Sequence, residues 1–191
     1  MTTALENSIK LHNPGMIEEI HRNKQYVFNT EDAEHLLRRV AWHLNFLRIC
    51  WKLGFGTLLG LYRDQQLIPY DTDVDILLPA SSYEITLRHL SKLENEEIYS
   101  TRLIPNAVYS LYYKNVYIDL YYYHNIPNSI YSGCGVKERW LKTPRSFLET
   151  TEYVRWKDSS WPAPSPIEEY LIHHYGPDWR TPKINYHAPI E

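Results

Sequence analysis

Three aspartates stand on two segments whose composition favours β-strands. Asp73 and Asp75 open the run Asp-Val-Asp-Ile-Leu-Leu-Pro, and Asp119 lies in Val-Tyr-Ile-Asp-Leu, residues 116–120. Side chains two apart on a strand leave the same face, about 6.6 Å apart along the strand. If the two strands are neighbours, the three carboxylates converge. Carboxylates of this kind are oxygen ligands suited to Mg²⁺ or Mn²⁺, although an isolated Asp-x-Asp pair is also common at strand ends without any function.

A glycine-rich segment, residues 56–60, precedes the first of these strands by about fifteen residues. Its sequence, Gly-Thr-Leu-Leu-Gly, is typical of a turn that opens a short helix. Backbone N–H groups at such a turn can approach a phosphate closely. Gly56 and Thr57 are therefore candidate substrate-binding residues.

Two charged residues between the glycine segment and the first strand allow two interpretations each. Arg63 could hold phosphate oxygens through its planar fork of N–H groups, or form an ion pair with Asp64 or Asp71 at the end of the helix. Asp71 could support the metal ligands or cap the turn before the strand. Three residues that follow Asp119 could contact a base or an acceptor, or pack on the sheet: Tyr121, Tyr123 and His124.

The flanking sequence predicts the elements that position these side chains. Thr30, followed by acidic residues, predicts the N-cap of a helix whose apolar stripe continues until Gly54. A helix over residues 83–93, with a capping box at its start, and an antiparallel hairpin are also expected. The expected strands cover residues 73–79, 108–113 and 116–123.

The C-terminal third is expected to be irregular until a last helix. Residues 125–166 are rich in Pro, Ser, Gly and Trp, and Ser165-Pro166-Ile167-Glu168 combines an N-cap, a first-turn proline and a capping-box glutamate. The sequence shows no internal repeat, linker or low-complexity tract. It therefore predicts one α/β (α+β) domain over residues 1–191, with a core of about residues 30–182 and a mixed central sheet flanked by helices.

Composition excludes several classes of protein. The 191 residues include 20 Lys and Arg against 23 Asp and Glu, so electrostatic binding of nucleic acid is not expected. No apolar stretch is long enough to span a bilayer, and the N-terminus does not read as a signal peptide, which predicts a cytosolic protein, at most peripheral to a membrane. The two cysteines form no CxxC pair, so neither a structural zinc site nor a disulfide scaffold is predicted.

The glycine segment, Arg63 and the run Ile-Pro-Tyr-Asp-Thr-Asp-Val-Asp-Ile, residues 68–76, together resemble the signature of the LicD/fukutin family. Ile118-Asp119-Leu120 resembles the third-carboxylate strand of that family. The run from Glu169 to Tyr175-Gly176, with Trp179 and Pro182, is similar to its C-terminal motif. The resemblance covers about residues 33–182 and implies a nucleotidyltransferase-like fold.

The resemblance also implies a reaction: transfer of a phospho-alcohol, such as phosphocholine or a polyol phosphate, from a CDP-linked donor to a hydroxyl of a glycan or lipid-linked glycan, with Mg²⁺ or Mn²⁺ and release of CMP. In this reading Asp73 and Asp75 hold the metal, and Asp119 binds the ion that polarises the acceptor hydroxyl or takes its proton. Two positions depart from the family pattern, which commonly has an acidic residue at Thr72 and tryptophan at Tyr70.

Two other functions fit the same residues. A true nucleotidyltransferase would use the carboxylates to transfer a nucleotide from an NTP and release pyrophosphate. A glycan-binding or scaffold domain without catalytic activity would retain the fold and an aromatic surface, since 14% of the residues are Phe, Trp or Tyr.

Overall fold

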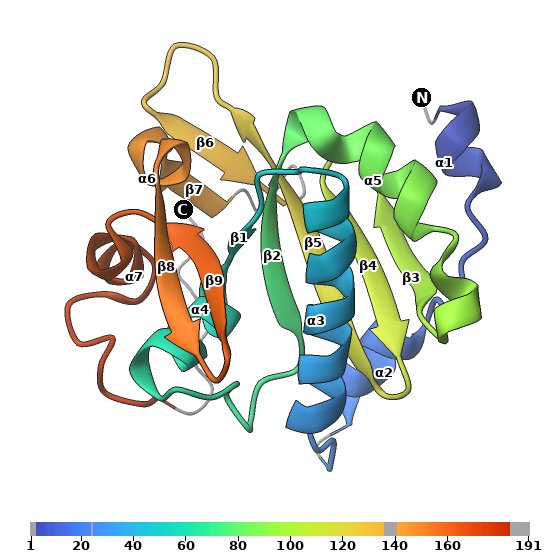
Figure 1. The fold of residues 1–191 in the computed structure, drawn as a ribbon, viewed down its shortest axis with the longest axis horizontal. Helices are drawn as coiled ribbons and strands as arrows, with labels where there is room; N and C mark the ends of the chain where they lie inside the picture. The colour runs from blue at the N-terminus through green and yellow to red at the C-terminus, as the bar shows by residue number, and fades with distance from the viewer. Residues whose placement is uncertain (1–2, 24, 136–140, 184–191) are drawn as a thin grey trace.

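A central sheet organises the protein, whose computed structural model describes residues 3–23, 25–135 and 141–183. In the described chain the sheet has seven strands, ordered β1-β2-β5-β4-β3, with β6 extending from β5 and β7 from β6 (Figure 1). The β2–β5 pair is parallel and the other described pairs are antiparallel. The strands are β1 Lys52–Leu53, β2 Val74–Pro79, β3 Tyr99–Ile104, β4 Val108–Tyr113, β5 Val116–Asn125, β6 Tyr131–Cys134 and β7 Leu141–Pro144.

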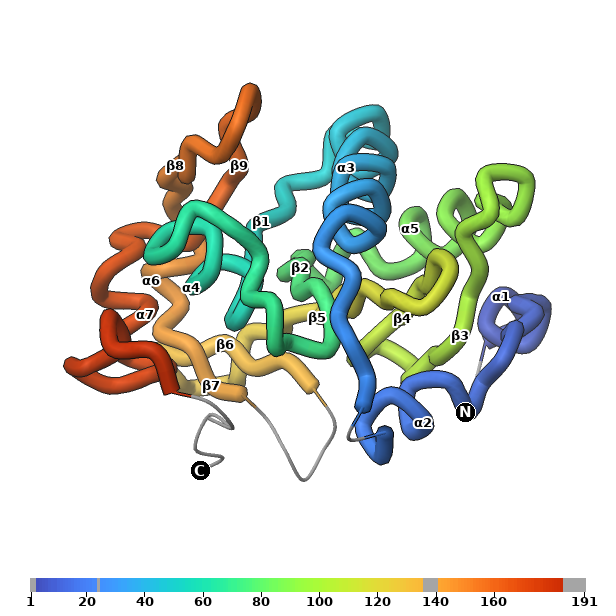
Figure 2. The backbone as a smooth tube through the Cα atoms, turned by 90° about the horizontal axis from the view of Figure 1, so that it is seen from below, coloured from blue at the N-terminus to red at the C-terminus, as the bar shows by residue number. Residues whose placement is uncertain are grey.

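Helices cover the two faces of the sheet unequally. Figure 2 shows α3 (Thr30–Phe46) and α5 (Tyr83–Leu90) on one side, and α2 (Met16–Arg22) on the other. Helix α1 (Ala4–Ser8) packs against α5, and α4 (Phe55–Arg63) packs against β2. Two 3₁₀ turns, Ala80–Ser82 and Leu93–Glu96, flank α5. None of the described helices is long and apolar enough to cross a membrane.

Helix α3 begins where the sequence predicts but ends earlier. Asn29, not Thr30, is its N-cap: the Asn29 side chain accepts hydrogen bonds from the next N–H groups. The helix ends at Phe46, and Arg48 then lies in the left-handed region with a φ of +55°. Residues 52–53 form β1 and pair with β2. Gly54 is therefore not a helix stop in the left-handed region; its φ of −117° is extended, and it is the N-cap of α4.

The side chains of β5 alternate between the two faces of the sheet. Ile118 and Leu120 are buried on the face that α3 covers. Asp119 shares the opposite face with Tyr117 and Tyr121. The parallel pairing of β2 with β5 confirms that the two aspartate-bearing strands are neighbours.

The region expected to be irregular contains regular elements. It holds β6, β7, the short helix α6 (Arg145–Glu149) and a hairpin of β8 (Thr151–Trp156) and β9 (Ser159–Pro164). Proline-rich sequence forms β9 because an edge strand can leave N–H positions unpaired. Helix α7 (Ile167–Tyr175) begins without the expected capping box: Glu152 of β8 accepts from the N–H of Ile167 at 3.0 Å. The box expected at the start of α5 makes no side-chain cap bond either.

Candidate active site

Four polar side chains form a row across the face of the sheet opposite α3. Asp75 on β2 is the register partner of Asp119 on β5, and Asp119 is the partner of Ser110 on β4. Ser110 in turn pairs with Arg102 on β3. Neighbouring strands lie about 4.8 Å apart, so side chains in one row on one face can interact.

Asp119 receives three side-chain donors from that row and from its own strand. Arg102 donates from its Nη2 and Ser110 from its hydroxyl, and the Tyr121 hydroxyl lies 3.3 Å from Oδ2. The Arg102 Nε also donates to the Ser110 hydroxyl at 3.0 Å. Asp119 is only 1% exposed, so these bonds replace the water that a buried carboxylate loses. The sequence pattern did not indicate Arg102 or Ser110, because only the strand order brings them to Asp119.

The N-terminus of α4 is attached to Asp75 at three points. The N–H of Gly54 donates to the Asp75 carbonyl at 3.1 Å, and the hydroxyl of Thr57 accepts from the Asp75 N–H at 2.8 Å. A backbone hydrogen bond from Gly56 reaches the Asp75 carboxylate. Thr57 is 2% exposed and acts here as a positioning residue. Direct contact of Gly56 or Thr57 with a substrate phosphate remains a prediction.

The turn that opens α4 is backed by α7. Phe55 has a φ of +34°, in the left-handed region that non-glycine residues rarely adopt. The Phe55 N–H faces the Tyr170 hydroxyl at 3.4 Å, and its ring packs edge-on against His174. Such backbone conformations persist where the surroundings impose them and concentrate at functional sites. Two residues of the C-terminal motif, Tyr170 and His174, thus contact the turn and support its conformation.

Asp71 lies against the same turn. Its Oδ1 accepts from the N–H of Thr72 at 2.9 Å. A Cβ atom on Gly56 would lie 2.5 Å from Asp71 Oδ2, so only glycine allows this approach. Asp71 therefore has the turn role that the sequence left open, while still facing the carboxylate cluster.

Burial raises the pKa of three clustered aspartates, and neighbouring carboxylates raise the pKa of two of them further. Burial raises the pKa of Asp71 to about 6. Burial, Asp71 and Asp119 raise the pKa of Asp73, and burial with the other three aspartates raises that of Asp75, both well above the ordinary value. Two carboxylates held near each other in a poorly solvated place cannot both ionise easily. The site therefore favours bound positive charge.

A divalent cation fits Asp73 and Asp75 better than all three aspartates at once. The described His, Cys, Asp and Glu side chains include no group of three gathered closely enough to hold an ion as they stand. Asp119 already has the guanidinium of Arg102 as its positive partner. Mg²⁺ commonly uses one or two carboxylates and completes its shell with substrate phosphates, which matches the Asp73–Asp75 pair. Metal ligation by Asp73, Asp75 and Asp119 remains a prediction.

Arg63 makes the ion pair that the sequence allowed as one of its two roles. Its Nε and Nη2 donate to the Asp64 carboxylate at 2.9 and 2.7 Å, and its Nη1 donates to the Trp179 carbonyl at 3.1 Å. These bonds join the end of α4 to the segment after α7. None of the Arg63 bonds in the described structure goes to Asp73, Asp75 or Asp119. The phosphate-binding role of Arg63 stays a prediction.

Tyrosines surround the aspartates, and of the four described below the sequence indicated only Tyr121 as a possible contact to a base or an acceptor. Burial raises the pKa of Tyr121 and of Tyr175, and nearby aspartates raise it further. Tyr117 and Tyr26 are affected in the same way, and the pKa of Tyr26 rises to about 12. These phenols stay neutral at physiological pH and can donate hydrogen bonds. Farther along β5, a ring nitrogen of His124 lies 2.5 Å from the Asn106 carbonyl oxygen.

Comparison with solved structures finds remote similarity. A lincosamide antibiotic adenylyltransferase, LnuA, bound to lincomycin is 15% identical, with a TM-score of 0.49 over 79% of this chain and 89% of the other. ANT(2″)-Ia in complex with adenylyl-2″-tobramycin is 11% identical, with a TM-score of 0.47 over 69% and 68%.

Sequence comparison identifies closer relatives. Ribitol-5-phosphate transferases FKTN of Macaca fascicularis and Homo sapiens are each 27% identical over 169 residues. The alignment covers 80% of this chain and 34% of each relative, so the chain spans about a third of their length. The family model described as LicD/FKTN/FKRP, nucleotidyltransferase domain, matches residues 48–166, which is more than half of the chain. The matched region includes the row of four polar side chains that contains Asp75 and Asp119. The chain therefore belongs to the LicD/FKTN/FKRP family.

Proposed function

We propose that this chain transfers a phospho-alcohol, of the polyol-phosphate or phosphocholine type, from a CDP-linked donor to a hydroxyl of a glycan or lipid-linked glycan, with release of CMP. The family and the ribitol-5-phosphate transferase relatives support the class of reaction. The observation that carries the proposal is the row of Asp75, Asp119 and Arg102, flanked by the Gly56 turn. That arrangement places the two carboxylates and the guanidinium of Arg102 on one face of the sheet. Beside them lies a turn whose backbone a phosphate could approach closely.

Asp73 and Asp75 would hold Mg²⁺ or Mn²⁺ in this proposal. The bound ion would neutralise charge on the phosphoryl oxygens and polarise the acceptor hydroxyl. Asp75 is suited to this task because α4 fixes its backbone on both sides, through Gly54 and Thr57. A carboxylate held in one position loses little freedom when the donor binds.

Asp119 would direct the attacking hydroxyl and accept its proton. Its oxygens already receive O–H donors from Ser110 and Tyr121, and the Tyr121 contact, at 3.3 Å, is a long hydrogen bond. An acceptor hydroxyl could replace Tyr121 there, while Arg102 keeps the carboxylate in place. Proton transfer to a positioned carboxylate is a common form of general base catalysis.

Products separate this proposal from its alternatives. The protein would be incubated with Mn²⁺ and, in separate reactions, CDP-ribitol, CDP-choline, CDP-glycerol and each NTP, and followed by phosphorus NMR. Slow hydrolysis of one CDP-alcohol to CMP and the alcohol phosphate, lost in Asp75→Asn, is the expected result, since water can replace the acceptor. Pyrophosphate from an NTP would instead show a nucleotidyltransferase, and binding of glycans without any product would show a binding domain.

A further inference from the structure

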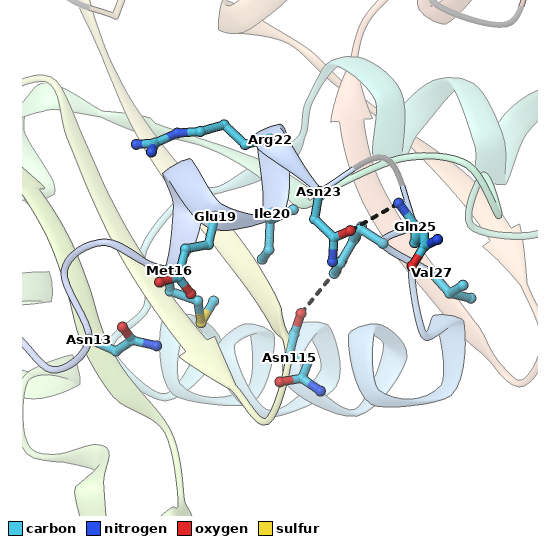
Figure 3. A pocket seen from close by; sticks show the side chains of 10 residues that line it. Asn13, Met16, Glu19, Ile20, Arg22, Asn23, Gln25, Val27 and Asn115 are labelled. Carbon is cyan, nitrogen blue, oxygen red and sulfur yellow. Dashed lines mark hydrogen bonds between the residues drawn. The ribbon is translucent and has the colours of Figure 1, made fainter.

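A pocket of about 700 Å³ lies beside α2, on the face of the sheet that carries the aspartates (Figure 3). Its walls come from three places: the turn before α2, α2 with the segment after it, and the Asn115 turn between β4 and β5. The volume is in the range of pockets that hold small molecules.

The lining of the pocket mixes polar with apolar side chains, and its two charged side chains, Glu19 and Arg22, are of opposite sign. Figure 3 shows the amide side chains of Asn23, Gln25 and Asn115 toward one end, and the amide of Asn13 with the carboxylate of Glu19 toward the other. Among the described residues, only Asn23 of this group uses its side chain in a hydrogen bond, accepting from the Gln25 N–H at 2.9 Å. An amide offers both donors and acceptors, as a hydroxyl does, so this lining matches several hydroxyl groups better than a phosphate.

The floor of the pocket connects it to the aspartates. Met16 and Ile20 are buried and pack on Tyr117, which shares its face of β5 with Asp119. The Tyr117 hydroxyl also lies 2.9 Å from His21 Nε2 and interacts with Thr72, next to Asp73. One layer of side chains therefore separates the pocket from the candidate active site.

Tyr26 marks the boundary between the two. It lines the pocket, and its hydroxyl donates to the Asn115 carbonyl at 2.9 Å. Burial raises the pKa of Tyr26, and the negative charges of Asp73 and Asp71 raise it further. A ligand in the pocket would thus contact Tyr26 and lie over the side chains that pack on Tyr117, on the face of the sheet that carries Asp119.

We propose that this pocket binds the neutral polyhydroxylated part of a substrate, either the sugar alcohol of the donor or a sugar of the acceptor. The inference rests on the proposed function, because it assumes that the reacting phosphate lies at Asp73 and Asp75. The lining supplies what such a group needs: amides for its hydroxyls, and a floor of methylene and methyl groups for its carbon chain.

The test compares two variants of the full chain by calorimetry in Mg²⁺. The pocket variant is Glu19→Ala with Gln25→Ala, which removes two exposed lining side chains. The control is Glu18→Ala, which removes an exposed carboxylate from the same helix but not from the pocket. The probes are CDP-ribitol, CDP and a set of glycans. CDP is included because it has the same nucleotide as CDP-ribitol but lacks the polyol.

If the donor's polyol occupies the pocket, the pocket variant weakens CDP-ribitol by about tenfold or more and leaves the affinity for CDP within about twofold. If the acceptor's sugar occupies it, the variant loses wild-type glycan binding and keeps CDP-ribitol. Either result, with Glu18→Ala unchanged, supports the proposal. Unchanged binding of CDP-ribitol and of glycans by the pocket variant overturns it, as does a wild type that binds neither of these two.

The proposed function can fail separately. A wild type that binds these probes through the pocket but forms no CMP from any CDP-alcohol would contradict the proposed reaction and leave the pocket assignment standing. If the wild type forms CMP while the pocket variant binds all probes normally, the proposed reaction is supported and the pocket assignment is contradicted.

Discussion

Arg102 is the residue whose role follows most directly from its contacts. It is the positive partner of Asp119, a carboxylate that is 1% exposed, and it also fixes the Ser110 hydroxyl on the strand between them. A buried charge that loses its partner is costly. Arg102 therefore acts as the counter-ion of Asp119 in the absence of a metal.

The variant Arg102→Met should lower the free energy of unfolding by about 3 kcal/mol in the presence of a chelator, because it leaves Asp119 buried and unpaired. Adding Asp119→Asn should recover at least about half of that loss. Mg²⁺ should stabilise Arg102→Met more than wild type, since Asp119 is then available to the ion. Urea denaturation of these three proteins, with and without Mg²⁺, measures all three effects, and a fully stable Arg102→Met would show that the ion pair contributes little.

The raised pKa of Asp71 predicts how stability depends on pH. A carboxyl whose pKa rises from 3.8 to about 6 on folding binds its proton more tightly in the folded state. Its contribution to stability is present below about pH 4 and is lost as the pH rises through about 6. Several other carboxyls have lowered pKa values and act in the opposite direction, among them Glu34 and Glu96. The comparison must therefore be between wild type and Asp71→Asn.

Without metal, Asp71→Asn should gain stability relative to wild type between about pH 4 and pH 8, by up to about 3 kcal/mol. Asn keeps the size of the side chain beside Gly56 but carries no charge. Melting temperatures across this pH range, measured with a chelator, give the difference directly. A constant difference would mean that Asp71 ionises as easily in the folded protein as in the unfolded chain.

At the scale of elements, the short helix α4 and the strand β2 behave as one unit. The Thr57 hydroxyl accepts the Asp75 N–H, and the backbone of Gly54 reaches the Asp75 carbonyl. The start of α4 is in turn held by Tyr170 of α7. Changes in α4 should therefore affect the position of the Asp75 carboxylate.

Thr57→Val should lower both stability and donor affinity. It removes the acceptor of a buried N–H, which costs about 1–3 kcal/mol. Thr86→Val is the matched control, because Thr86 is also buried on a helix and bonds to the Tyr122 hydroxyl, but lies on α5, across the sheet from the aspartates. Denaturation and titration with CDP-ribitol in Mg²⁺ would separate the two. Equal donor affinity in both variants would show that Thr57 has only a structural role.

The sequence was sufficient for the local pattern of these elements. The period of two on β5 placed Asp119 opposite Ile118 and Leu120, and the apolar stripe located α3. It was not sufficient for Arg102 and Ser110, which meet Asp119 only through the order of the strands. The predicted cap of α7 was wrong for a related reason. The N–H of Ile167 at the start of that helix is bound by Glu152 from β8, and tertiary contacts of this kind leave no local signal in the sequence.

At the scale of the whole molecule, the two faces of the sheet have different tasks. Helices α3 and α5 cover one face (Figure 2), which is apolar. The other face carries the carboxylates and the tyrosines around them. Helix α2 packs against that second face through Tyr117 of β5, and α7 contacts the start of α4 through Tyr170. No sequence pattern identified α2 as part of the site, because its role depends on packing against residues almost a hundred positions away.

The central claim is that a divalent cation and a nucleotide-linked donor share one site built on Asp75. Calorimetric titration of CDP-ribitol into the wild type and into Asp75→Asn, each with Mg²⁺ and with a chelator, tests it most directly. The wild type should bind the donor at least about tenfold more tightly in Mg²⁺ than in chelator, since the diphosphate completes the metal's coordination. In Asp75→Asn this difference should disappear. Donor binding that is equally tight with and without Mg²⁺, or a Mg²⁺ effect that survives Asp75→Asn, would contradict the shared site.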